Sequence, residues 1–148
     1  MPALPAPGAG MTEDAEPSSL GGLARWAFSP RRVEKPWGWE LIWADAEQYV
    51  GKVLFVRAGH SLSLQFHRSK DESWYVESGR AELELGDVGD ASLDREVITA
   101  GACFRYRPGT VHRVTAIEDT TILEVSTPHL DDVVRLEDRY GREGTSEP

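Results

Sequence analysis

The sequence is poor in cysteine and in long apolar runs, and each shortage excludes a class of protein. Cys103 is the only cysteine among 148 residues, so no disulfide can form within the chain. No apolar run approaches the roughly 20 residues that a membrane-spanning helix needs, and no basic-then-apolar leader opens the chain. We therefore expect a cytoplasmic protein with no membrane partner.

Basic residues are also scarce. Lysine and arginine total 16 against 25 acidic residues, which gives a formal net charge of -9 at pH 7. A nucleic-acid-binding protein of this size needs a basic face that displaces counterions from phosphates, so we expect no nucleic-acid partner. With 40% hydrophobic and 28% charged residues, the composition is typical of one globular domain.

Prolines are concentrated at the beginning of the chain, where residues 1–30 contain five of the nine. This stretch shows little apolar periodicity, and we predict a mobile arm over residues 1–31. Its apolar residues Leu23, Trp26 and Phe28 would stay loose, or would pack onto the domain or onto a second subunit. Residues 32–142 are predicted to form a single domain, followed by a tail at residues 143–148.

From residue 32 onwards, short alternating or apolar segments are separated by turns rich in glycine, proline and aspartate. This pattern indicates β-strands. We predict them at residues 39–44, 49–56, 63–67, 72–78, 80–85, 95–98, 102–106, 112–116 and 121–126. Only residues 130–140 are predicted to be helical. Nine strands and a short C-terminal helix or extension predict an all-β fold, closed or made of two sheets.

Four polar residues stand where these strands could bring them together. Gln65 and His67 are two residues apart on one predicted strand and so project from the same face. A hairpin after His67 can bring the Glu72 carboxylate opposite it, and His112 begins a later strand. Two imidazoles, a carboxylate and an amide oxygen suit zinc, manganese, iron, cobalt or nickel. The spacing alone leaves open the alternative that these four residues lie on the surface and are solvated.

The intervals between these residues follow a known pattern. The series Gly59, Gln65, His67, Glu72 and Gly79 resembles the first cupin motif at every interval, with glutamine in place of the first histidine. A looser resemblance to the second cupin motif is carried by Gly101, Pro108, Gly109 and His112. These two motifs imply a double-stranded β-helix, also called a jelly roll.

A closer resemblance is to the type II mannose-6-phosphate isomerases, in which glutamine at the position of Gln65 is a hallmark. It is carried by Lys-Pro-Trp-Gly at residues 35–38, by residues 62–79, and by Asp-Val-Val-Arg-Leu-Glu-Asp-Arg-Tyr-Gly-Arg at residues 132–142. The resemblance implies one divalent metal, commonly zinc, held by Gln65, His67, Glu72 and His112. The sequence contains no glycine-rich nucleotide-binding segment, so we expect the isomerase module without the guanylyltransferase part. We also expect a homodimer.

The reaction that this resemblance implies is an aldose–ketose interconversion of a sugar or sugar phosphate through an enediol. A base must then act at the substrate carbon. We predict Lys70 for this task if desolvation lowers its pKa, with Glu72 as the other candidate. The resemblance points to Arg135 and Arg142 for binding the phosphate, and Arg107 is added because it lies near His112. Trp74 would either stack on the sugar or belong to the core.

Departures from the family pattern keep other functions open. Lys70 stands where the family usually has arginine, and Ala116 stands where the second cupin motif usually has asparagine. Lysine keeps the charge but lacks the planar fork that binds a phosphate through two bonds. The alternatives are a metal- and sugar-binding module without turnover, and another cupin enzyme such as an epimerase or a dioxygenase.

Overall fold

A computed structural model describes residues 17–145, and the rest of the predicted arm and tail lies outside the described residues. The helix and strands run in this order: η1 (Pro17–Trp26), β1 (Arg31–Lys35), β2 (Gly38–Asp45), β3 (Val50–Val56), β4 (Leu64–Phe66), β5 (Glu72–Ser78), β6 (Arg80–Asp87), β7 (Asp94–Thr99), β8 (Cys103–Tyr106), β9 (Thr110–Ala116), β10 (Thr120–Ser126) and β11 (Val134–Glu137).

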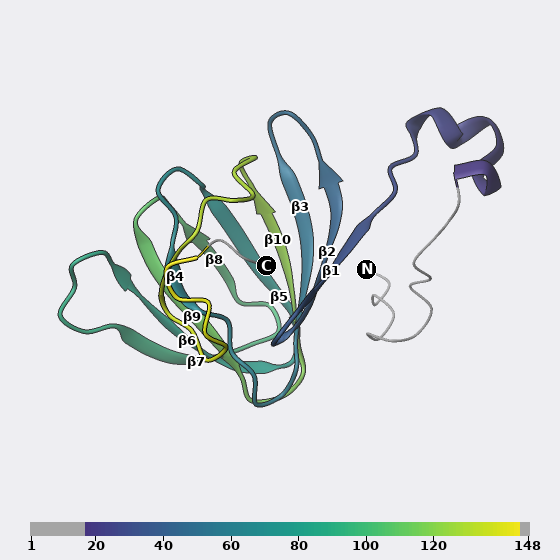
Figure 1. The fold of residues 1–148 in the computed structure, drawn as a ribbon. Coiled ribbons are helices and arrows are strands. Elements are labelled where there is room, and N and C mark those ends of the chain that lie inside the picture. Colours follow the sequence, from purple (N-terminus) through teal and green to yellow (C-terminus); the bar gives the residue numbers. More distant parts are fainter. Residues whose placement is uncertain (1–16, 146–148) are drawn as a thin grey trace.

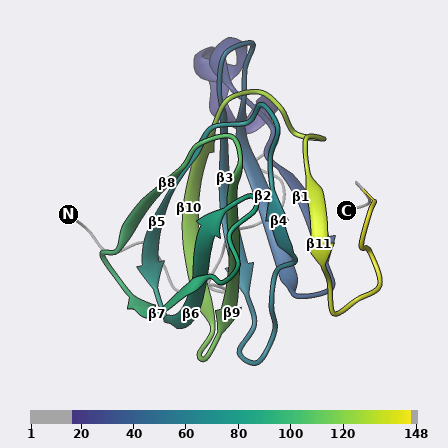
Figure 2. The same ribbon diagram turned by 90° about the vertical axis from the view of Figure 1, so that its left-hand side faces the viewer.

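The strands form two antiparallel sheets that lie face to face (Figure 1). The larger sheet has the order β1-β2-β3-β10-β5-β8, and the smaller has the order β11-β4-β9-β6-β7. Figure 2 shows the smaller sheet in front of the larger one. This architecture confirms the predicted all-β jelly roll.

The period-2 alternation of the strands places one side of each sheet in the core. Along β3, the side chains of Val50, Leu54 and Val56 point inward and are at most 3% exposed. Ile122 of β10 and Val114 of β9 are fully buried against the same cluster. The interior between the sheets is therefore apolar over most of its length, and the charged residues inside it stand out.

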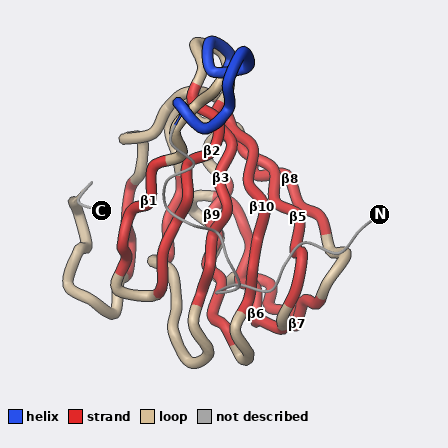
Figure 3. Tube along the Cα trace, turned by 90° about the vertical axis from the view of Figure 1, so that its right-hand side faces the viewer, coloured by secondary structure: helices blue, strands red, loops and turns tan. Residues whose placement is uncertain are grey.

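The outer face of the larger sheet, which is turned toward the viewer in Figure 3, also carries apolar side chains. A hollow of about 790 Å³ on this face is lined by side chains that include Trp39, Trp43, Tyr75 and Leu123. Trp43 and Tyr75 are 50% and 45% exposed. Apolar side chains therefore occur on both faces of this sheet.

The helix predicted at residues 130–140 is wrong. Residues 134–137 form β11, which pairs with β4 so that Val134 lies opposite Phe66 and Arg135 opposite Gln65. Adjacent β-branched residues at 133 and 134 favour extended backbone, and the pairing satisfies the hydrogen-bonding groups of a strand edge. β1 was missed because its sequence, Arg-Arg-Val-Glu-Lys, is almost entirely charged.

The segment before β1 stands away from the two sheets (Figure 1). Leu23 and Trp26 of η1 are each 66% exposed, and Phe28 is 49% exposed. These apolar side chains are thus not covered by their own domain, and their packing against a second subunit stays a prediction. Within the described residues, no helix is long and apolar enough to cross a bilayer.

Candidate metal centre and its cavity

The connection between β4 and β5 positions two of the predicted metal ligands. It is not the predicted hairpin, because β4 belongs to the smaller sheet and β5 to the larger one, so the turn crosses from one sheet to the other. His67 directly follows β4, a turn covers residues 68–71, and Glu72 opens β5. The third ligand, His112, lies on β9 opposite Gln65 of β4. The backbone N–H of Gly109 donates to the carbonyl of His67 at 2.8 Å, which ties the turn before β9 to the connection between β4 and β5. Residues about 45 positions apart in the chain are thereby brought together.

The two imidazoles converge on one carboxylate oxygen. The Nε2 atoms of His112 and His67 lie 3.0 and 3.4 Å from Oε1 of Glu72. Ligand atoms around one cation with bonds of about 2.1 Å lie about 3.0–3.4 Å apart, depending on the coordination geometry. His67, Glu72 and His112 are at most 3% exposed, and their ligand atoms all lie within 4.8 Å of one another.

Backbone carbonyls fix the tautomer of both rings. Nδ1 of His67 donates to the carbonyl of Asp132, and Nδ1 of His112 donates to the carbonyl of Thr110 at 2.9 Å. Because a carbonyl only accepts, each Nδ1 carries the proton and each Nε2 presents a lone pair to Glu72. Among the described residues, neither Nε2 nor Oε1 of Glu72 has a hydrogen-bond partner. These buried donor atoms fit a divalent cation.

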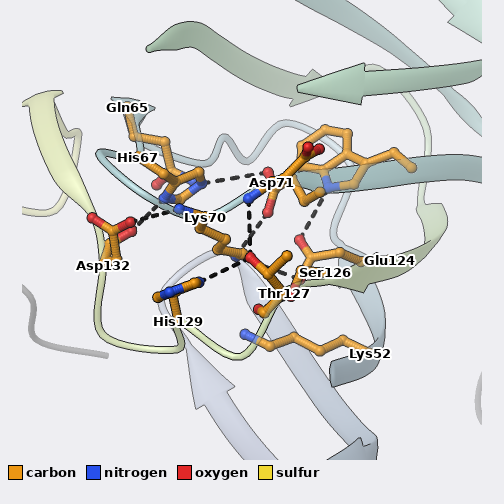
Figure 4. Close-up of polar contacts among 12 residues, drawn as sticks. Lys52, Gln65, His67, Lys70, Asp71, Glu124, Ser126, Thr127, His129 and Asp132 are labelled. Carbon is orange, nitrogen blue, oxygen red and sulfur yellow. Dashed lines mark hydrogen bonds and ion pairs between the residues drawn. The ribbon is translucent and has the colours of Figure 1, made fainter. Parts of the chain in front are cut away.

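Gln65, the predicted fourth ligand, faces the same space. Its Oε1 accepts a hydrogen bond from the hydroxyl of Ser63 at 2.7 Å, and its side chain lines the cavity beside His67. Figure 4 shows Gln65 next to His67. Coordination by its amide oxygen stays a prediction.

The turn between His67 and Glu72 is held by a residue that sequence reasoning missed. The Asp132 carboxylate accepts hydrogen bonds from the backbone N–H groups of residues 68, 69 and 70, at 3.0, 2.7 and 2.8 Å (Figure 4). Burial alone would raise the pKa of Asp132, but these donors hold it below its ordinary value. Asp132 therefore fixes, through the turn, the spacing between His67 and Glu72, two of the predicted metal ligands.

We expect Asp132→Ala to lower the free energy of unfolding by about 1–2 kcal/mol at pH 7, because three backbone donors lose their acceptor. A lowered pKa in the folded state stabilises the fold above the unfolded pKa of about 3.9, and this contribution is lost as the pH falls through the folded value. Denaturant titrations should thus show parent and variant converging in acid. Asp131→Ala, at an exposed neighbouring position, serves as the control.

Lys70 forms a buried ion-pair network with two carboxylates. Its Nζ lies 2.7 Å from Oε2 of Glu72 and 3.7 Å from Oε2 of Glu124. Burial lowers the pKa of Lys70, but the charges of Glu124 and Glu72 outweigh burial and raise it. Burial also opposes ionisation of Glu72, yet the positive charge of Lys70 holds the pKa of Glu72 well below its ordinary value. The expected lowering of the Lys70 pKa is therefore wrong in direction, and its role as a base is left without that support.

Glu124 was not predicted, although its strand was. It lies in register between Lys52 of β3 and Trp74 of β5, and its Oε1 accepts a hydrogen bond from the indole N–H of Trp74 at 3.0 Å (Figure 4). Burial, and then the charge of Glu72, raise the pKa of Glu124. The sequence contained a sign of this role, because Glu124 is a charged residue at an inward position of β10, where the other inward residues are apolar or small. Lys52 occupies a similar inward position in β3.

A cavity of about 280 Å³ opens beside the metal ligands, between the inner face of the larger sheet and residues 130–142. Three acidic side chains line it, Glu40, Glu124 and Asp131. Its cationic lining residues are Arg31, Lys35, Lys52, Lys70, Arg135 and Arg142. Although the chain is acidic overall, cationic side chains outnumber acidic ones in the lining of this cavity, which favours an anionic ligand.

The predicted substrate-binding residues divide into two groups. Arg135 and Arg142 line the cavity, whereas Arg107 is exposed on the turn after β8 and does not line it. Trp74 is 2% exposed and packs edge-on against Tyr106, with ring centroids 4.9 Å apart. The geometry thus brings the two arginines to the cavity, leaves Arg107 outside it, and places most of Trp74 in the core.

Two facing antiparallel sheets with a His–Glu–His cluster between them define a cupin. A sequence model of the family described as "Mannose-6-phosphate isomerase C-terminal" matches residues 27–138. The chain belongs to this family. Its fold is also similar to that of oxalate decarboxylase from Bacillus subtilis, a structure with Mn(II) centres, with a TM-score of 0.61 and 21% identity over 72% of this chain and 30% of that one.

Two relatives are longer proteins. The mannose-1-phosphate guanylyltransferase ManC of Salmonella typhimurium is 35% identical over 116 residues, which cover 76% of this chain and 23% of the relative. Mannose-1-phosphate guanylyltransferase 2 of Escherichia coli O157:H7 is 32% identical over 122 residues, 78% of this chain and 24% of the relative. The chain thus spans about a quarter of the length of these curated relatives.

We expect metal retention to weaken as the solution is made more acidic, because protons compete with the cation for imidazole lone pairs. Zinc-loaded protein dialysed at pH 7.5, 6.5 and 5.0 should show decreasing zinc content by elemental analysis. Occupancy that is unchanged at pH 5.0 would argue against ligation by His67 and His112.

Proposed function

We propose that the chain is a metal-dependent sugar phosphate isomerase that interconverts an aldose and a ketose through an enediol, acting on mannose 6-phosphate. The main support is that the buried cluster of His67, Glu72 and His112 opens into a cavity lined by cations. A sugar phosphate offers both a carbonyl oxygen for a metal and a phosphate for the cationic wall. Membership of the isomerase family favours the same reaction.

In this proposal, His67, Glu72 and His112, joined by Gln65, hold one divalent cation, with zinc as the first candidate. Such a cation, when bound, supplies an electrophile that polarises a carbonyl and stabilises negative charge on oxygen. The protein itself contributes two features, which are the fixed tautomers of the two imidazole rings and the burial that keeps bulk water from the ligands.

Proton transfer between two substrate carbons needs a group that accepts a proton and returns it. Lys70 and Glu72 were the predicted candidates, and Glu124 joins them. Because its pKa is raised, the Glu124 carboxyl holds a proton at a higher pH than an exposed glutamate does. The Lys70 ammonium, between Glu72 and Glu124, would donate hydrogen bonds to substrate oxygens. Arg135 and Arg142 would face the phosphate.

The activity can be measured directly. Formation of fructose 6-phosphate from mannose 6-phosphate, coupled to NADPH production, should be detected after loading with zinc, manganese, cobalt or nickel. It should disappear after treatment with a chelator and return when metal is restored. No turnover with any of these metals, in protein of verified metal content, would contradict the isomerase function.

The second candidate is a sugar phosphate-binding module without turnover. It is favoured by the ion pairs that already engage Lys70 and Glu72, the predicted bases. Calorimetric binding of mannose 6-phosphate without its conversion would support this module over the enzyme. Oxygen uptake with iron-loaded protein would instead point to a dioxygenase. Cytoplasmic location and a homodimeric state stay predictions.

A further inference from the structure

A row of mostly apolar side chains crosses the outer face of the larger sheet. The register places five residues side by side on neighbouring strands, in the order Leu41 (β2), Val53 (β3), Leu123 (β10), Tyr75 (β5) and Cys103 (β8). All five line the hollow on this face, which is turned toward the viewer in Figure 3. The outer face of an antiparallel sheet is commonly solvated and polar, so an apolar row across five strands indicates a surface that another element covers.

A second apolar surface is also uncovered, and it lies in η1 and the two residues after it. We call residues 20–28 the projecting segment. Leu23 and Trp26 are each 66% exposed, and Leu20 and Phe28 are 40% and 49% exposed. Figure 1 shows this segment standing away from the two sheets rather than lying on them. The chain thus presents a protruding apolar segment and an apolar hollow, and neither covers the other.

The backbone before β1 directs the projecting segment away from its own sheet. Residues 27–30 form no turn. The ring of Pro30 fixes its own φ and disfavours a helical conformation at Ser29, which keeps this connection extended. The segment leads into β1 at the edge of the sheet, and no residue of β1 lines the hollow. To reach the hollow of its own chain, the segment would have to reverse direction within these residues, whereas a second copy offers the same hollow without a reversal.

The charges of the two surfaces are complementary. The projecting segment has one charged side chain, Arg25, which is exposed. Two of the three charged residues that line the hollow are paired within their own chain, Glu124 with Lys70 and Arg105 with Asp71. The third, Glu77, is half-buried and forms no ion pair with the residues that the structure describes. A segment with one positive charge therefore suits a hollow that holds one unpaired carboxylate.

We propose that the projecting segment of one chain docks into the hollow of a second copy, in a two-fold dimer that contains this contact twice. The same two surfaces are then used in both directions, as a closed two-fold arrangement requires. A protruding segment fills a hollow, whereas two hollows placed face to face would leave a void. None of the predicted metal ligands lines the hollow, so this inference does not depend on the isomerase function.

The oligomeric state and one thiol test the contact in the full chain. Sedimentation velocity should show a dimer. Cys103, the only cysteine, is exposed and lines the hollow, so a thiol reagent should label it more slowly in the dimer than in a dissociated variant. A monomer at every concentration would overturn the proposal. A dimer in which Cys103 reacts as fast as in the dissociated variant would place the interface elsewhere and would also overturn it.

Single variants on either surface should weaken the dimer. Trp26→Ser should raise the dissociation constant about 100-fold, because burial of one large apolar side chain contributes about 10-fold and the contact occurs twice. Tyr75→Lys places a charge in the hollow and should have an effect of at least this size. Val97→Ser is the control, because Val97 is 50% exposed but lies on β7 of the smaller sheet. An unchanged dissociation constant in Trp26→Ser would contradict the proposal.

A mixture of the two variants separates exchange between copies from other arrangements. In a mixed dimer, the intact segment of Tyr75→Lys meets the intact hollow of Trp26→Ser, and both changes fall in the second contact, which can be lost only once. The mixture should therefore associate about 10-fold more tightly than either variant alone. No gain on mixing would reject the exchange. Slow labelling of Cys103 in a monomeric parent, accelerated by Trp26→Ser, would instead place the segment on its own chain and overturn the proposal.

Discussion

His67→Ala is expected to abolish metal binding while the β fold persists. Two of the three clustered ligand atoms are imidazole nitrogens, and removing one of them should lower metal affinity by on the order of 100-fold or more. Isomerase activity should fall in parallel. The core strands pack independently of this side chain, so the circular dichroism spectrum should remain that of the parent. Elemental analysis after gel filtration measures the bound metal directly.

His60→Ala is the matched control for this prediction. His60 is also a partly buried histidine, but its Nδ1 pairs with the hydroxyl of Tyr140 at 2.8 Å, and it is not part of the cluster. Its replacement should leave the metal content unchanged. His112→Ala is less informative, because this ring stacks on Tyr106 at 4.3 Å and its removal also opens a void. Equal metal content in His67→Ala and parent would refute the assignment.

Lys70→Met is expected to destabilise the metal-free protein by about 3–5 kcal/mol, because it leaves two buried carboxylates without their cation. Glu72 and Glu124 are at most 4% exposed, and Lys70 contacts both. Saturating zinc should restore part of the loss, because a cation at Glu72 replaces the missing charge. Denaturant unfolding with and without metal measures both effects.

The double variant Lys70→Met/Glu124→Gln tests the cause of this effect. If repulsion between the carboxylates is responsible, removing the charge of Glu124 should recover part of the stability that the single variant loses. A loss below about 1 kcal/mol in Lys70→Met, or no recovery in the double variant, would show that the ion-pair network contributes little.

The clustering of the candidate metal ligands could be predicted from sequence because most of their spacing is local and specific. Gln65, His67 and Glu72 fall within eight positions, at the end of one strand and the start of the next along the chain. His112 was selected because it begins a later strand, and the looser resemblance to the second cupin motif supported it. Strand periodicity predicted an all-β fold, closed or made of two sheets, and the cupin resemblance implied the jelly roll. By contrast, the support from Asp132 depends on a contact more than 60 residues away in the chain, which no local pattern encodes.

The inward lysines were missed for a different reason. A lysine within a strand is usually solvated, so neither Lys35 nor Lys52 was considered for the site. Only the register shows that Lys52 lies opposite Glu124 and that both face the interior. The C-terminal segment was misread because the acidic residues around Val133 and Val134 suggested an amphipathic helix. Its pairing with β4 is a tertiary effect.

The segment that carries Asp132 has a consequence for how short a working domain can be. The backbone carbonyl of Asp132 fixes the His67 tautomer, and its carboxylate holds the turn between His67 and Glu72. The residues that follow include Arg135 and Arg142, which line the cavity. A chain truncated before residue 130 keeps every ring and carboxylate of the metal cluster, yet it loses both the orientation of one imidazole and the guanidinium wall. The minimal functional length is thus set by the chemistry of the cavity rather than by the hydrophobic core.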